Sequence, residues 1–132
     1  MAFERVNPSD LGDPTGFNHG MLGPAGGRVL FVAGQTARGP EGAIVYGGIV
    51  AQWERALQNV LAVVRQAGGG PESIGRMTIY VTSRLDYLAS RKRIGEVWHA
   101  TMGRHYPAVT LVEVSGLVDE NARVEIEATA VI

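Results

Sequence analysis

The clearest alternation of apolar and polar positions lies near the end of the sequence. Alternate residues of a strand face opposite sides, so the strand predicted at 108–114 places Glu113 on one face only. The strand predicted at 122–131 repeats the pattern and places Glu125 and Glu127 together on one face of an otherwise apolar run. Because carboxylates are rarely buried without a partner, we expect these acids to have a structural or a chemical role.

Two helices are predicted from apolar residues that recur at spacings of three and four. The first runs from Ile49 to Ala67, and the glycines and proline at 68–71 end it. The second runs from Leu85 to Met102 and is interrupted by the basic run at 91–93. Between the helices, β-branched and aromatic residues at 77–83 predict a strand.

The first part of the chain is predicted to form strands around glycine-rich turns. Residues 1–16 carry proline and glycine and predict an irregular lead-in, with a short strand at Phe3–Val6. The segments at 17–22 and 28–35 flank the turn sequence "GPAGG". We predict that these two segments pair as a hairpin.

This order of elements predicts a single α+β domain over residues 1–132. Its strands are expected to form one mixed sheet of about six strands, with both helices on one face. The second face of the sheet mixes acids with apolar residues and is too apolar for a surface in contact with water. We therefore expect a second copy of the chain to cover that face.

The composition limits the classes of protein that the chain can represent. Its 132 residues are 45% hydrophobic, which is enough for one buried core. Twelve Lys and Arg against 13 Asp and Glu leave a net charge of −1, whereas nucleic-acid-binding surfaces usually show a basic excess. We therefore expect no nucleic-acid partner and no membrane attachment. The absence of cysteine excludes disulfides and thiolate metal sites. Without a bilayer-length apolar run or a signal-peptide core, the chain is expected to be cytoplasmic.

Four segments together resemble the RidA/YjgF/YER057c/UK114 superfamily, the Rid family, whose older label is endoribonuclease L-PSP. They are "VLFVAGQ", "ALQNVLAVV", "YPAVTLVEVSGL" and "RVEIEATAVI", and the likeness extends from Phe17 to Val131. The resemblance implies a chorismate-mutase-like subunit in a homotrimer, whose sheets form a central barrel with small-molecule clefts between subunits. It also implies hydrolysis of enamines and imines, such as 2-aminoacrylate, to 2-keto acids and ammonia, without a metal or organic cofactor.

The chain departs from the family pattern at three positions of the expected cleft. Family members have an arginine after the Pro-Ala pair, where this chain has Val109, which cannot bind a carboxylate by two parallel hydrogen bonds. The family's early tyrosine corresponds to Phe17, and a common serine before Gly-Gln corresponds to Ala33. Loss of a charge-assisted bond in a closed cleft costs about 2–5 kcal/mol. We therefore expect these residues to form an apolar wall and the usual activity on 2-aminoacrylate to be weak.

Two residues are candidate catalytic groups. Glu127 resembles the family glutamate that positions water or a proton, and a carboxylate in a cleft suits acid–base work. Its alternative role is structural, as a partner of an arginine or a backbone amide. His19 is a candidate accessory proton donor, and its alternative is a structural or surface histidine.

Further polar residues are candidates for binding the substrate. Asn18 offers a hydrogen-bonding amide beside the expected cleft. Arg91 could replace the missing carboxylate clamp, or it could belong to a solvated helix face, which is the commoner meaning of a basic run. Gly34 and Gln35 offer backbone and amide groups to a ligand, or Gly34 serves only a close approach between neighbouring elements.

Two functions fit these residues. The first is a divergent family enzyme that acts on a small enamine, imine or related unstable metabolite in an intersubunit cleft. It would work by water addition or proton transfer, and a tautomerisation or cyclisation on the same scaffold fits equally well. The second is a non-catalytic ligand-binding or regulatory trimer that keeps the cleft without the deaminase chemistry.

Overall fold

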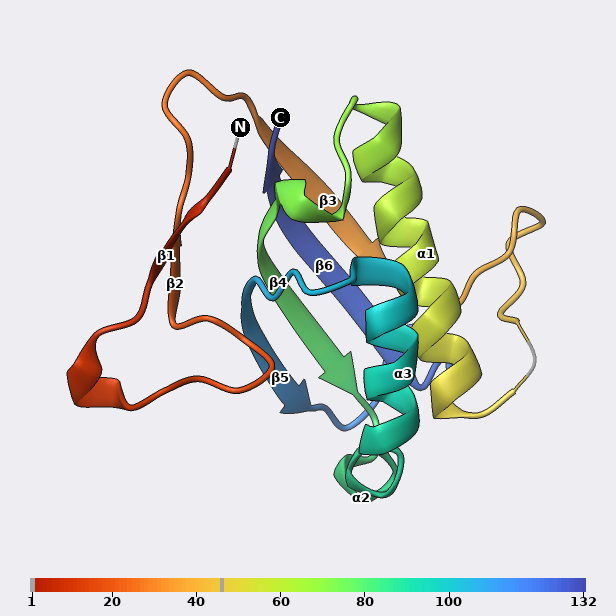
Figure 1. The fold of residues 1–132 in the computed structure, drawn as a ribbon. Helices are drawn as coiled ribbons and strands as arrows, with labels where there is room; N and C mark the ends of the chain where they lie inside the picture. Colours follow the sequence, from red (N-terminus) through yellow and green to blue (C-terminus); the bar gives the residue numbers. More distant parts are fainter. Residues whose placement is uncertain (1, 46) are drawn as a thin grey trace.

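The computed structural model describes residues 2–45 and 47–132, and it contains a four-stranded sheet with helices packed on one face (Figure 1). The strands, in their order across the sheet, are β3 (Val29–Gln35), β6 (Val124–Val131), β4 (Ile74–Val81) and β5 (Ala108–Glu113). The helices are α1 (Ile49–Gln66), α2 (Arg84–Ala89) and α3 (Arg91–Met102). A separate two-stranded sheet is made of β1 (Glu4–Val6) and β2 (Gly20–Leu22). Single 3₁₀ turns lie at Ser9–Leu11 and Pro71–Ser73.

Strand β6 lies inside the sheet and runs antiparallel to both of its neighbours, β3 and β4. Strand β4 runs parallel to β5, and α2 and α3 form the long crossover that parallel strands need. Strands β3 and β4 also run in the same direction, with α1 as their crossover and β6 inserted between them. This arrangement confirms the predicted α+β class, with a mixed sheet and the helices on one face.

The core lies between the sheet and helices α1 and α3. Burial alternates along β6, so every second side chain faces the helices. On α1 the apolar residues at spacings of three and four are buried, as the sequence pattern predicts: Trp53, Ala56, Leu57, Val60, Leu61 and Val64. In the part of the chain that the structure describes, no helix combines the length and the apolar character needed to cross a membrane.

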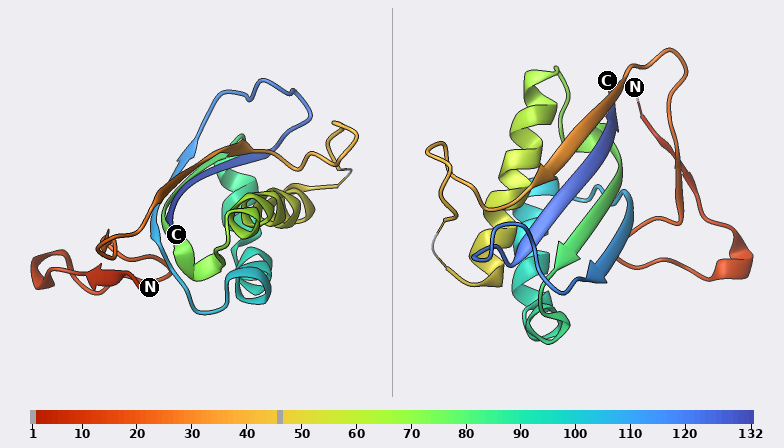
Figure 2. Two further views of the ribbon diagram at one scale, coloured as in Figure 1. Left: turned by 90° about the horizontal axis from the view of Figure 1, so that it is seen from above. Right: turned by 180° about the vertical axis from the view of Figure 1, so that it is seen from behind.

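The other face of the four-stranded sheet is not covered by any helix in the described ranges (Figure 2). Phe31 and Val29 lie on this face of β3 and are 79% and 58% exposed. Large apolar side chains gathered on an exposed surface are typical of a protein–protein contact. The assembly of several copies through this face stays a prediction.

Three predictions about the elements are wrong: the hairpin, the single sheet of about six strands and the single second helix. The segments at 17–22 and 28–35 do not form a hairpin, because β2 pairs with β1 and β3 pairs with β6. The six strands therefore lie in two sheets, one of two strands and one of four. The helix predicted at 85–102 is two helices, because Ser90 between them has φ −107° and ψ 5°, outside the helical range.

Candidate functional site

A cavity of about 510 Å³ lies between helix α3 and the edge strand β5. Three of the predicted substrate-binding residues line it together: Phe17, Arg91 and Val109. Aromatic rings form much of its wall, and they belong to Phe17, Trp53, Tyr87, Trp98 and Tyr106. We call this space the aromatic cavity, and its other lining residues are Thr15, Gly16, Ile79, Ile94, Gly95, His99 and Leu111.

Regular secondary structure explains why two sides of the aromatic cavity come together. On α3 the lining residues recur at helical spacing and so share one face of the helix: Arg91, Ile94, Gly95 and Trp98. On β5, Val109 and Leu111 are two residues apart and point to the same side of the sheet. Val109 pairs with the buried Met77 on β4, which places that side toward the helices.

Arg91 gives the aromatic cavity a positive charge. No Asp, Glu or Lys lines this cavity among the residues that the structure describes. Arg91 is exposed and forms no ion pair with another described residue. Its guanidinium can therefore bind an anion at the cavity, and its planar fork matches a carboxylate.

Stacked aromatic pairs stiffen the cavity wall. The rings of Trp98 and Tyr106 lie 6.1 Å apart with an interplanar angle of 3°, and those of Trp53 and Tyr87 lie 5.8 Å apart at 21°. The indole N–H of Trp98 donates to the carbonyl oxygen of His105 at 3.1 Å. The buried indole N–H of Trp53, in contrast, has no hydrogen-bond partner among the described residues.

A network of amides holds the lead-in segment against strand β5. Asn18 is buried; its backbone N–H donates to the Pro107 carbonyl at 3.1 Å and its side-chain amide donates to the Tyr106 carbonyl. Its side-chain oxygen accepts a hydrogen bond of 2.8 Å from the Asn7 amide, whose own oxygen accepts from the His19 backbone N–H at 2.8 Å. The segment before Asn18 is thereby fixed beside the cavity.

The ring of His19 lies in the same lead-in network. Its edge packs on Phe17, with ring centroids 5.2 Å apart, and its Nε2 lies 3.3 Å from the Gly12 carbonyl. His19 does not line the aromatic cavity. His19 therefore contacts a residue of the cavity wall, Phe17, but does not reach the cavity itself.

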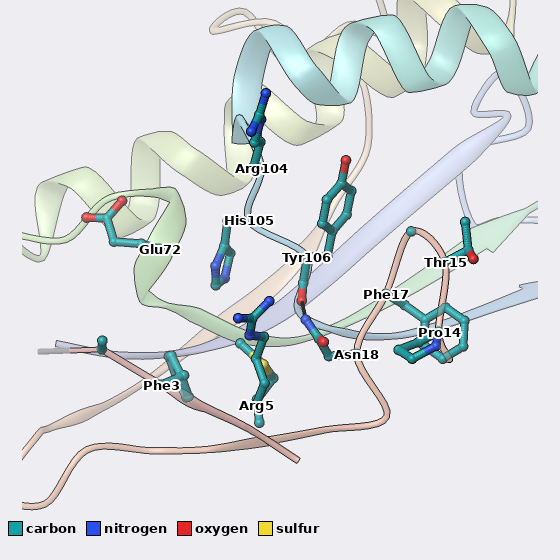
Figure 3. Close-up of a pocket in the computed structure, with 13 residues that line it drawn as sticks. Phe3, Arg5, Pro14, Thr15, Phe17, Asn18, Glu72, Arg104, His105 and Tyr106 are labelled. Carbon is teal, nitrogen blue, oxygen red and sulfur yellow. Dashed lines mark hydrogen bonds between the residues drawn. The ribbon is translucent and has the colours of Figure 1, made fainter. Parts of the chain in front are cut away.

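A second cavity, of about 590 Å³, lies on the other side of the lead-in segment (Figure 3). It shares Thr15, Gly16, Phe17 and Tyr106 with the aromatic cavity, so these four residues separate the two spaces. Asn18 lies below Tyr106 in Figure 3, and Arg5 points from β1 toward His105. Arg5, Glu72 and Arg104 give the second cavity more charged side chains than the aromatic cavity has.

Glu127 lies on the uncovered face of the sheet. It pairs across β4 with Thr78, whereas the next residue of β6, Ala128, pairs with the buried Met77 on the helix side. Since Val109 also pairs with Met77, Glu127 and the aromatic cavity lie on opposite sides of the same sheet.

Tyr80 is the hydrogen-bond partner of Glu127. Its hydroxyl donates to Oε1 of Glu127 at 2.7 Å. This hydrogen bond raises the pKa of Tyr80 above its usual 10.0, with smaller contributions from burial and from the negative charges of Glu127 and Glu125, while Arg76 acts in the opposite direction. The structural partner of Glu127 within one chain is thus a tyrosine.

The three candidate residues at the end of β3 lie outside the aromatic cavity. The side-chain amide of Gln35 donates to the Ala33 carbonyl at 3.1 Å, across a bulge in the pairing of β3 with β6. A Cβ built on Gly34 would lie 2.5 Å from Oε2 of Glu125. Gly34 therefore permits a close approach of the Glu125 carboxylate to the β3 backbone.

Sequence reasoning did not identify most of the cavity wall. The apolar spacing of the two predicted helices assigns Trp53 and Trp98 to the core, and both are buried. They also line the aromatic cavity, as do Tyr106 and Gly95. For Gly95 and Trp98 a signal was available, because their helical spacing from Arg91 places them on the same face of α3. No group of three or more His, Cys, Asp or Glu side chains among the described residues is placed to hold a metal ion.

The fold and the aromatic cavity define an α+β subunit with a small-molecule-sized site beside the edge of its sheet. Residues 14–132 match the model of the family described as Endoribonuclease L-PSP. The chain therefore belongs to this family, and the resemblance to the RidA/YjgF superfamily is confirmed.

Individual relatives agree with this assignment. A RutC family protein of Pyrococcus abyssi is 34% identical over 105 residues, which are 79% of this chain and 79% of that protein. A 2-iminobutanoate/2-iminopropanoate deaminase of Capra hircus is 29% identical over 105 residues, or 79% of this chain and 73% of the relative. The crystal structure of YyfB, a Rid family protein of unknown function from Yersinia pestis, is similar over 100% of both chains, with 30% identity and a TM-score of 0.85.

Proposed function

We propose that the chain acts on a small enamine or imine that carries a carboxylate, and that the aromatic cavity is its share of a cleft between subunits. The observation that carries the proposal is that Phe17, Arg91 and Val109 line one cavity. The relatives from Capra hircus and Homo sapiens, at 29% and 25% identity, are named as imine deaminases. Their names support imine hydrolysis as the reaction type.

Arg91 is the proposed anchor for the substrate carboxylate. Val109 offers neither charge nor donor, so an anion in the aromatic cavity needs another cation. Arg91 supplies one from the start of α3, without an acid in the described residues to neutralise it. Two parallel hydrogen bonds from its guanidinium would fix the carboxylate and present the rest of the substrate to the cavity.

Hydrolysis of the bound imine needs a water molecule and proton transfer. Water adds to the imine carbon, the carbon–nitrogen bond then breaks, and the products are a 2-oxo acid and ammonia. Glu127 is the proposed acid–base group for these proton transfers. Because Glu127 lies on the opposite side of the sheet from Arg91, a second copy of the chain has to bring its own Glu127 to the cavity. This requirement supports the homotrimer as the working form.

The test is hydrolysis of imino acids generated in the assay from amino acids by an amino-acid oxidase. We expect release of ammonia and 2-oxo acid to be faster with the protein than without it. Arg91→Ala should lower kcat/KM about 10- to 100-fold, because one charge-assisted hydrogen-bond pair is lost. Arg93→Ala is the matched control, since Arg93 lies on the same helix outside the aromatic cavity. Absence of turnover with every imino acid would contradict the proposal.

Mixed assemblies test whether Arg91 and Glu127 come from different subunits. Glu127→Gln and Arg91→Ala should each lose at least about nine-tenths of the activity, and co-refolding the two variants should restore part of it. Restoration occurs only if an intact Arg91 from one subunit meets an intact Glu127 from another. Full activity of Glu127→Gln alone would remove Glu127 from the mechanism.

A non-catalytic binding protein is the second candidate function, and one observation favours it. The described residues place no carboxylate in the aromatic cavity. Such a site suits binding more directly than proton transfer. A metabolite that raises the melting temperature and is recovered unchanged would support this alternative, and its conversion would contradict it.

A further inference from the structure

Gly95 lies in the interior of α3 and lines the aromatic cavity. Glycine inside a helix is less favourable than alanine, so Gly95 does not stabilise α3. Packing does not demand glycine either, because a Cβ built there meets no other atom within 4 Å. The remaining effect of Gly95 is to leave open space next to the cavity wall.

The walls around this space are flat and apolar. The parallel rings of Trp98 and Tyr106 form one stacked pair, and those of Trp53 and Tyr87 form another. Aromatic rings prefer offset-stacked or edge-on neighbours and gain more from them than from burial alone. At about 510 Å³, the cavity also falls in the range of roughly 300–1,000 Å³ that holds ligands much larger than a three-carbon acid.

One charged group marks where the carboxylate of a ligand would lie. Arg91 lines the cavity and offers a positive charge to that carboxylate.

We propose that the aromatic cavity selects 2-imino and 2-oxo carboxylates with a flat aromatic side chain, and that Gly95 determines this specificity by leaving room for the ring. The ring lies among the aromatic walls, and Arg91 holds the carboxylate. This proposal rests on the proposed function, because it names the substrate class of that same site.

Binding of two stable product analogues tests the selectivity. Isothermal titration calorimetry of the full chain with phenylpyruvate and with pyruvate compares an aromatic with a small 2-oxo acid. We expect phenylpyruvate to bind at least about tenfold more tightly, as the sum of the ring contacts. Equal affinity for the two acids, or tighter binding of pyruvate, would overturn the proposal.

Filling the open space tests the role of Gly95. Gly95→Leu should weaken phenylpyruvate binding by about tenfold or more and leave pyruvate binding within about twofold. Ala100→Leu adds a similar side chain on the exposed side of α3 and should change neither affinity. If Gly95→Leu does not fold, Gly95→Ala takes its place, because alanine is more favourable than glycine in a helix. Gly95→Ala should lower the affinity for phenylpyruvate by less than the leucine variant does. Unchanged phenylpyruvate binding in the folded Gly95 variants would exclude this role.

Turnover assays separate this proposal from the proposed function. Preferential, Gly95-dependent phenylpyruvate binding without hydrolysis of any imine supports the selectivity and contradicts the enzymatic function. Hydrolysis of small aliphatic imines with a kcat/KM equal to or above that of the phenylalanine imine supports the enzymatic function and contradicts the selectivity. Failure of the selectivity and failure of the enzymatic function therefore give different results.

Discussion

Tyr80 and Glu127 face each other on the uncovered side of the sheet, joined by a hydrogen bond of 2.7 Å. The neutral phenol donates to the carboxylate, and loss of its proton would place two negative charges side by side. The pKa of Tyr80 is raised for this reason. If Glu127 serves a cleft in an assembled protein, Tyr80 is the group that orients its carboxylate.

We predict that Tyr80 ionises above pH 10.0 and that Glu127→Gln lowers its pKa. The folded protein holds this proton more tightly than the unfolded chain does. The resulting stabilisation is full below pH 10.0 and is lost as the pH rises through the folded-state pKa. Tyrosinate absorbance of the wild type minus that of Tyr80→Phe measures the ionisation. The free energy of unfolding should fall more steeply above pH 10.0 in the wild type than in Tyr80→Phe, and identical slopes would contradict the prediction.

Some residues of the aromatic cavity could be predicted from the sequence and others could not. The resemblance pointed to Phe17 and Val109, and it made Arg91 a candidate to replace the missing carboxylate clamp; the structure places all three at one cavity. Trp53 was predictable as core from its helical spacing, but the same spacing cannot show that a buried ring borders an open space. That property depends on which residues of β5 and the lead-in segment lie opposite, and no local pattern encodes it.

At the scale of elements, a hydrogen bond connects the start of α2 to the end of β5. The Oγ atom of Ser83 accepts the backbone N–H of Asp86 at 3.1 Å, and the Glu113 carboxylate accepts the backbone N–H of Arg84 at 2.9 Å. Both bonds satisfy donors that a helix N-terminus leaves unpaired. Glu113, one of the acids in the alternating strands, thus has a structural partner on the backbone.

Ser83→Ala should lower the free energy of unfolding by about 1 kcal/mol, because the N-terminal cap of α2 is lost. Urea-induced unfolding followed by circular dichroism measures the change. Ser90→Ala is the matched control, since the Ser90 side chain forms no capping bond at the start of α3. Equal losses in the two variants would show that the cap contributes nothing specific.

Element types were more predictable than their partners. The helix expected at 49–67 is observed as α1 over Ile49–Gln66, because its apolar spacing and its glycine stop are local signals. The hairpin expected between 17–22 and 28–35 fails because strand pairing depends on chain segments far apart, and β3 finds its partner in β6. The break at Ser90 was not predicted, because the apolar pattern of residues 85–102 was interpreted as one interrupted helix.

At the scale of the whole molecule, the helices cover only one side of the sheet. The uncovered side holds the exposed Phe31 together with Glu127 and its neighbours. An association through this side would bury the apolar residues and move Glu127 into a contact between copies. The proposed chemistry requires, in addition, that the aromatic cavity beside the β5 edge of a neighbouring copy adjoin Glu127.

Phe31→Asp should shift the protein to smaller species in analytical ultracentrifugation, because a charge replaces a ring that is 79% exposed in one chain. Leu85→Asp is the control, since Leu85 is 72% exposed on α2, away from the sheet. The control should keep the wild-type oligomeric state and imine hydrolysis. Wild-type association of Phe31→Asp would show that another surface holds the copies together.

The inserted position of β6 has a consequence for the order of events during synthesis. Its partner β3 precedes it by roughly a hundred residues, so β3 leaves the ribosome long before its hydrogen-bonding groups can be paired. The apolar side of α1 must also wait, because part of the surface that covers it belongs to β6. Such long-range pairing slows folding relative to locally connected folds. The four-stranded sheet therefore cannot close until β6 has been synthesised and has paired with β3 and β4.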